Sequence, residues 1–151
     1  MTKKFTLITL VLIGIALRLA AQSPGEIAPI LQKCMDIPDL QKYYPPSVND
    51  KKSPIYIVQY PVAFPEGIVL TKNGSEVKFI TISQLAENPV QEYFMFRSLN
   101  SGPDSTTAVI NYFYDCNSAL KQFKMLTINV DLEKAGKRWN VSQAILKGDT
   151  K

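Results

Sequence analysis

The chain of 151 residues contains no histidine, and this absence removes whole classes of catalytic site. Serine and cysteine nucleophiles of the triad type transfer their proton to a histidine, so both mechanisms are excluded. Histidine is also the commonest ligand of catalytic zinc. The sequence lacks a Walker loop and a glycine-rich dinucleotide fingerprint as well. We therefore expect no metal site and no cofactor, and we assign no catalytic residue.

Cysteine is nearly as scarce, with Cys34 and Cys116 far apart in the chain. Two such distant residues make no metal-binding motif. In an oxidising compartment they could close one disulfide around a long loop. Because spacing does not show whether the two thiols meet, the alternative of two free thiols stays open.

Long apolar runs are missing except near the amino terminus. Two lysines precede an apolar run over residues 5–17, and Ala20 and Ala21 follow it. This order of basic, apolar and small residues is typical of a secretory signal peptide. The run is shorter than the about 20 residues that a membrane-spanning helix needs. We predict that residues 1–21 are a signal peptide cleaved after Ala21, and that the protein is secreted or periplasmic. An uncleaved amino-terminal anchor is the alternative.

A strong excess of one charge is absent once that segment is removed. The whole chain has seventeen basic and thirteen acidic residues, and three of the basic residues lie within 1–21. The remaining 130 residues therefore carry fourteen basic against thirteen acidic residues, a net charge of +1. This balance, with the basic residues scattered, does not indicate a nucleic-acid-binding surface. A chain of 130 residues is the size of one domain.

The exported chain divides into a helical part, residues 22–54, and a sheet part, residues 55–151, which together form one predicted domain. Ser23 and Glu26 have the spacing of a capping box, with a proline between them. Pro38 ends or kinks the helix, and a proline-rich connector follows it. Five apolar residues recur at helical spacing and give the helix one apolar face: Ile27, Ile30, Leu31, Cys34 and Met35.

A hairpin is the most specific local signal in the sheet part. Asn73-Gly74 is the preferred pair of a two-residue hairpin turn, and it aligns Leu70 with Val77. In this register the apolar residues share one face and the polar residues between them share the other. Turn chemistry and hydrophobic pattern therefore select the same alignment.

Five other segments alternate between apolar and polar residues, as strands do, and a helical turn is expected over residues 83–88. Short turns between consecutive strands favour antiparallel neighbours. We predict an α+β fold in which the amino-terminal helix packs on a curved antiparallel sheet, a meander. The segments are 55–60, 92–99, 106–116, 122–133 and 139–146.

Asp115 stands beside Tyr112 and Tyr114 in the third of these segments. A carboxylate base and a tyrosine donor can together move a proton next to a carbonyl group. Such a pair would support an isomerase-like enzyme that needs no histidine. In a regular strand, however, Asp115 points away from both tyrosines. A structural role for the three residues is therefore the favoured interpretation.

The last hairpin has a turn of glycine and basic residues followed by a Trp-x-Val sequence, Gly136-Lys137-Arg138-Trp139-Asn140-Val141. With the long strands before it, this pattern resembles small exported domains of the nuclear transport factor 2-like and cystatin-like types. The resemblance covers the last third of the chain and implies a helix packed on a curved antiparallel sheet. It implies no activity, because these families include enzymes, binding proteins and oligomerisation modules. Trp139 is expected in the core.

Asp104-Ser105-Thr106 lies in a predicted loop and resembles a bacterial O-glycosylation tripeptide of exported proteins. The resemblance implies a glycan on Ser105, where a loop would leave it at the surface.

These observations favour a non-catalytic binding or accessory protein whose partner is a protein, a peptide or a small apolar ligand. The predicted ligand or partner surface comprises Tyr112, Tyr114, Lys137 and Arg138. Two alternatives stay open: the isomerase-like enzyme with a carboxylate and a tyrosine, and an inhibitor or immunity-type partner of another exported protein.

Overall fold

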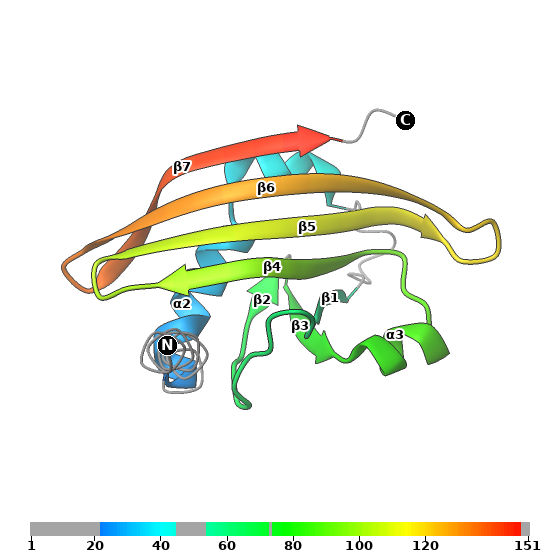
Figure 1. Ribbon diagram of the computed structural model, residues 1–151, viewed down its shortest axis with the longest axis horizontal. Coiled ribbons are helices and arrows are strands. Elements are labelled where there is room, and N and C mark those ends of the chain that lie inside the picture. The colour runs from blue at the N-terminus through cyan, green and yellow to red at the C-terminus, as the bar shows by residue number, and fades with distance from the viewer. Residues whose placement is uncertain (1–21, 45–53, 73, 149–151) are drawn as a thin grey trace, which may run out of the picture.

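The computed structural model describes residues 22–44, 54–72 and 74–148 (Figure 1). The predicted signal peptide and residues 45–53 of the connector lie outside the described residues. In chain order the elements are α2 (Pro24–Met35), the 3-10 helix η1 (Pro38–Tyr43), β1 (Ile55–Val58), β2 (Thr71–Lys72), β3 (Ser75–Ile80), α3 (Ile82–Glu87), β4 (Tyr93–Ser101), β5 (Ser105–Asn117), β6 (Gln122–Ala135) and β7 (Arg138–Gly148).

Helix α2 begins as its sequence predicts. The Ser23 backbone N–H donates to the Glu26 carboxylate at 3.0 Å, which closes the capping box. The helix continues through Pro29 and ends before Pro38. The five apolar residues at helical spacing are buried. Fully burying one such aliphatic side chain stabilises the fold by about 1.5–3 kcal/mol, so this face holds α2 on its neighbours.

The strands form one curved sheet in the order β2-β3-β1-β4-β5-β6-β7 (Figure 1). Strands β4 to β7 are antiparallel neighbours in chain order, as predicted. Strand β1 lies between β3 and β4 and pairs in parallel with both. The sheet is therefore mixed, and the prediction of an all-antiparallel meander is wrong at this point. Short turns predict pairing only between consecutive strands, whereas β1 pairs across the β2–β3 hairpin and α3.

The β2–β3 hairpin has the predicted register. Thr71 pairs with Glu76 and Lys72 with Ser75, and the Val77 N–H donates to the Leu70 carbonyl at 2.9 Å. Gly74 has φ of 76°, a left-handed conformation that glycine adopts without strain. Asn73 lies outside the described residues. Turn chemistry and hydrophobic pattern thus identified this alignment correctly.

Buried side chains of α2, η1 and the sheet belong to one hydrophobic cluster. Aromatic residues fill one part of it: the Tyr112 ring stacks on Phe94 at a centroid distance of 4.5 Å, and Tyr114 stacks on Tyr112 at 5.6 Å. Trp139 is buried, as expected. Side chains of this hydrophobic cluster therefore fill the space between the helices and the sheet in the part of the chain that the structure describes.

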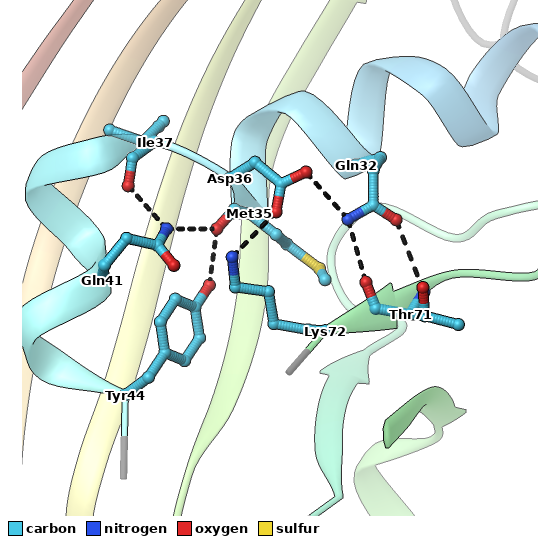
Figure 2. Close-up of polar contacts among 8 residues, drawn as sticks. All are labelled: Gln32, Met35, Asp36, Ile37, Gln41, Tyr44, Thr71 and Lys72. Carbon is cyan, nitrogen blue, oxygen red and sulfur yellow. Dashed lines mark hydrogen bonds and ion pairs between the residues drawn. The ribbon is translucent and has the colours of Figure 1, made fainter. Parts of the chain in front are cut away.

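A polar network joins α2, η1 and β2 (Figure 2). The Gln32 carboxamide donates to the Thr71 carbonyl at 3.0 Å and accepts from the Thr71 N–H at 3.4 Å, so it pairs with the β2 backbone as a neighbouring strand would. Asp36 accepts from the Lys72 ammonium at 2.8 Å and from Gln32 at 3.1 Å. At the end of α2, the Met35 carbonyl accepts from the Tyr44 hydroxyl at 2.9 Å. Carbonyls at a helix end need such partners, and these contacts orient α2 against the sheet edge.

Candidate functional site

A cleft of about 490 Å³ lies where the start of α2 meets the β4–β5 and β6–β7 turns. Figure 1 shows the two turns at the left end of the sheet, with the start of α2 below them on the same side. We call it the α2-end cleft, and its lining includes Gln22, Glu26, Lys134, Lys137 and Trp139. It contains two residues that the sequence analysis singled out, Lys137 and Trp139.

The β6–β7 hairpin positions the basic residues of this cleft. Lys134 and Trp139 are cross-strand partners, and the Lys134 ammonium lies 5.7 Å from the centroid of the indole ring. This cation–π contact orients the ammonium at the cleft. Lys137 lies in the turn itself, next to Gly136, whose φ of 62° the tight turn requires. Arg138 begins β7 and is exposed, but it does not line the cleft.

The lysines of the α2-end cleft form no ion pair among the described residues. Glu26 is the only acidic residue in the described lining. Its carboxylate accepts hydrogen bonds from the Ser23 N–H and hydroxyl at 3.0 and 3.3 Å. Within the described residues, the ion pairs are Lys72–Asp36 and Lys124–Asp115, so neither Lys134 nor Lys137 has an anionic partner. The buried oxygen of the Gln22 carboxamide also has no donor in the described part of the chain. The described lining therefore carries two lysines against one carboxylate, a net charge of +1, and an unpaired acceptor.

A second chemical feature, which the sequence analysis missed, is a buried pair of Glu92 and Tyr112. The Tyr112 hydroxyl donates to Glu92 Oε2 at 2.5 Å. Tyr112 is 0% exposed and Glu92 is 5% exposed. Glu92 Oε1 has no partner among the described residues. Burial is the main cause that raises the pKa of Glu92, while the Tyr112 hydrogen bond opposes the rise.

The alternation of inward and outward side chains along the strand could have predicted that Glu92 is buried. It stands two residues before Phe94 and four before Phe96, so the alternation that buries those rings also directs Glu92 inward. Neither Glu92 nor Tyr112 lines the α2-end cleft, and the Tyr112 ring is enclosed in the core.

Asp115 does not point away from the neighbouring tyrosine, contrary to the expectation for a regular strand. The register of β5 and β6 shifts between Tyr114 and Asn117, and Asp115 has a left-handed φ of 51°. Lys124 lies opposite Tyr114, with its ammonium 5.8 Å from that ring centroid and 2.6 Å from the Asp115 carboxylate. The bulge thus places the Asp115 side chain on the same face of the sheet as the Tyr114 ring. Asp115 also contributes to the raised pKa values of Glu92 and Tyr112.

The sequence left a disulfide and two free thiols open, and the structure has two free thiols. Cys34 is 0% exposed on the inner face of α2, and burial raises its pKa to about 12. Cys116 is partly exposed at the β5 bulge, where its N–H donates to the Gln91 carbonyl at 3.0 Å. The two thiols belong to different parts of the fold. The number of residues between two cysteines does not show whether they lie close enough for a disulfide.

Ser105 is exposed at the start of β5, and its glycosylation stays a prediction. In residues 22–44, 54–72 and 74–148, no group of three or more cysteine, aspartate and glutamate side chains could hold a metal ion. Within the same ranges, no helix has the length and apolar character needed to cross a membrane.

Comparison of the chain with protein-family models, curated proteins and solved structures finds no match. The resemblance to nuclear transport factor 2-like and cystatin-like domains therefore stays a prediction.

Proposed function

We propose that the chain is an exported, non-catalytic binding or accessory protein, and that it recognises an acidic segment of a partner through the α2-end cleft. The observation that carries this proposal is the pair of lysines, Lys134 and Lys137, in an open cleft without an anionic partner in the described residues. Charge complementarity of this kind gives an interface its specificity and its rate of association.

The packing of the concave side of the sheet supports binding from outside the core. Side chains of α2 and the sheet share one hydrophobic cluster, so the partner has to be met at the surface. Lys134 is already oriented by the Trp139 ring, and a preoriented ammonium loses less side-chain entropy when it binds a carboxylate. The two lysines therefore suit carboxylates spaced along one segment of a partner.

Trp139 provides a direct test because it is the only tryptophan in the chain. Titration with a glutamate-rich peptide should change the indole fluorescence, since a bound carboxylate draws the Lys134 ammonium away from the ring. The K134Q/K137Q variant should bind at least about tenfold more weakly, and 0.5 M salt should weaken wild-type binding similarly. The matched control is K78Q/K147Q, which removes two exposed lysines outside the cleft.

Equal binding by K134Q/K137Q and wild type would reject the α2-end cleft as the recognition site. The isomerase-like alternative has one observation in its favour, the Glu92–Tyr112 pair. Turnover of a substrate that is abolished by both E92Q and Y112F would replace the binding proposal with that alternative. Inhibition of another exported protein, lost in K134Q/K137Q, would assign the same cleft to an inhibitor or immunity-type role.

A further inference from the structure

A second cleft, of about 560 Å³, lies at the other end of the sheet. Its walls come from α3 and the segment after it, from the start of β4, and from the turn that joins β5 to β6. Figure 1 shows α3 and the β5–β6 turn at the end of the molecule opposite the start of α2. We call it the α3-end cleft, and the lining residues used here are Leu85, Val90, Tyr93, Cys116, Lys121 and Phe123.

Aromatic rings hold the two sides of this cleft in fixed positions. Tyr93 of β4 stacks on Phe113 of β5 at a centroid distance of 4.7 Å, and Phe113 meets Phe123 of β6 edge-on at 5.5 Å. Tyr93 and Phe123 therefore line the cleft as the two ends of one row of rings across three strands. Phe123 is nevertheless 60% exposed. An exposed phenyl ring beside Leu85 and Val90 offers apolar surface that a ligand can cover.

Among the described residues that line the cleft, Lys121 is the only charged one. Its backbone is fixed in the turn, with φ of 51° and an N–H that donates to the Ser118 carbonyl at 3.3 Å. Its ammonium is in neither of the two ion pairs found among the described residues. Asp115, one residue before the lining thiol of Cys116, is already paired with Lys124. The cleft therefore has one uncompensated positive charge beside an apolar wall.

We propose that the α3-end cleft binds a small aromatic carboxylate, a flat molecule of one or two fused rings. The rings lie against Phe123 and Tyr93, and the carboxylate pairs with the Lys121 ammonium. The volume of the cleft is within the range of ligand sites, about 300–1,000 Å³. This site is separate from the α2-end cleft, shares no lining residue with it, and does not depend on the function proposed above.

Cys116 supplies a reporter for this cleft, because its partly exposed thiol is in the lining and Cys34 is 0% exposed. The experiment measures the rate of alkylation of Cys116 by iodoacetamide, read by mass spectrometry, as 2-naphthoate is added to the purified chain. We expect saturating naphthoate to slow alkylation by at least about fivefold. We expect the half-protecting concentration to rise about tenfold or more in F123A and in K121Q.

Two matched controls test whether the effect belongs to the cleft. V69A shortens an apolar side chain and K147Q removes a lysine, both exposed and outside the cleft, and both should leave the protection unchanged. Neutral 2-naphthalenemethanol should protect wild type about tenfold less effectively than naphthoate, and the two should protect K121Q equally.

Absence of protection in the wild type would overturn the proposal. So would equal protection of F123A and wild type, or equal protection by naphthoate and the neutral alcohol in the wild type. Because Phe123 and Lys121 are both exposed, their replacement should leave the far-ultraviolet circular dichroism unchanged. If F123A or K121Q has an altered dichroism spectrum, F123L or K121M takes its place. The same results then support or overturn the proposal.

Discussion

The carboxylates of Asp36 and Glu92 both receive hydrogen bonds from inside the fold, but only one of them is fully paired. Asp36 uses both oxygens, accepting from Lys72 and from Gln32, and its side chain is 45% exposed (Figure 2). Glu92 uses one oxygen, is 5% exposed, and leaves the other without a partner in the described residues. An ion pair compensates the charge of Asp36, whereas burial raises the pKa of Glu92 and so favours its neutral form. We therefore expect the first site to stabilise the contact between α2 and β2, and the second to lower stability at neutral pH.

The largest effect in this comparison is expected from removing Asp36. Asp36→Ala leaves the Lys72 ammonium, which is only 8% exposed, without its anionic partner. We expect a loss of about 2 kcal/mol in the free energy of unfolding, measured by urea denaturation. The loss stays below the about 3–5 kcal/mol of a fully buried pair, because water can reach the half-exposed position.

The neutral background K72M provides the control for that loss. With the ammonium gone, Asp36→Ala removes only the contact to Gln32, and the cost should fall below about 1 kcal/mol. An equal loss in both backgrounds would show that the helix end, and not the ion pair, depends on Asp36.

At the half-paired site, Tyr112→Phe should produce the next largest effect. It removes the only donor to Glu92 found in the described residues, and we expect a loss of about 1.5 kcal/mol at pH 7 in urea denaturation. The pKa of Glu92 should rise further, because the Tyr112 hydrogen bond is the contact that lowers it. The Glu92 side-chain carboxyl shift in NMR would follow that rise.

Tyr44→Phe is the matched control, since it also removes one hydroxyl from a buried tyrosine of the same cluster. The Tyr44 hydroxyl donates to a neutral carbonyl, that of Met35, and its loss should cost about 1 kcal/mol. A smaller loss for Y112F than for Y44F would mean that Glu92 is already neutral at pH 7 and needs no donor.

Glu92→Gln should change the dependence of stability on pH more than stability itself. Because burial raises the pKa of Glu92, the folded state holds its proton more tightly than the unfolded chain does. The stability that this proton provides is complete below the ordinary carboxyl pKa and is lost as the pH rises through the folded pKa. We therefore expect E92Q to gain about 1 kcal/mol relative to wild type at pH 8 and nothing at pH 4.

Urea denaturation of both proteins across that pH range measures the difference. A wild type that gains stability relative to E92Q as the pH rises would show that Glu92 is stabilised as an anion. The distinction drawn between Glu92 and Asp36 would then be wrong.

The local parts of this fold were predictable from sequence because their signals are local. The Asn73-Gly74 pair and the alternation of Leu70 with its neighbours gave the β2–β3 register, and Ser23 with Glu26 gave the start of α2. The four long strands at the carboxyl end were also identified, since each alternates over many residues and short turns join them. What these features share is that a few neighbouring residues decide them.

The missed features depend on contacts between distant segments. Strand β1 has only four residues, and it pairs with β3 and β4, both of which lie far from it in the chain. The pairing of Glu92 with Tyr112 joins residues twenty apart in the chain. Both clefts are likewise formed by segments that the sequence separates, so Lys137 was found as a basic turn and not as part of a cleft.

The smallest effect is expected at the bulge that turns Asp115 toward the tyrosines. Asp115 holds φ of 51°, a conformation that aspartate tolerates better than alanine and that glycine adopts freely. Its ion pair with Lys124 is exposed on both sides, and such pairs contribute little. Asp115→Ala should therefore cost about 0.5 kcal/mol in urea denaturation, whereas Asp115→Gly should match or exceed the stability of wild type. Lys124→Gln, which removes the pair and keeps the backbone, should leave the unfolding transition unchanged. If D115G and K124Q instead lost the same stability, the ion pair and not the bulge would hold Asp115 beside Tyr114. The exposed pair would then stabilise the fold as the Lys72–Asp36 pair is expected to do.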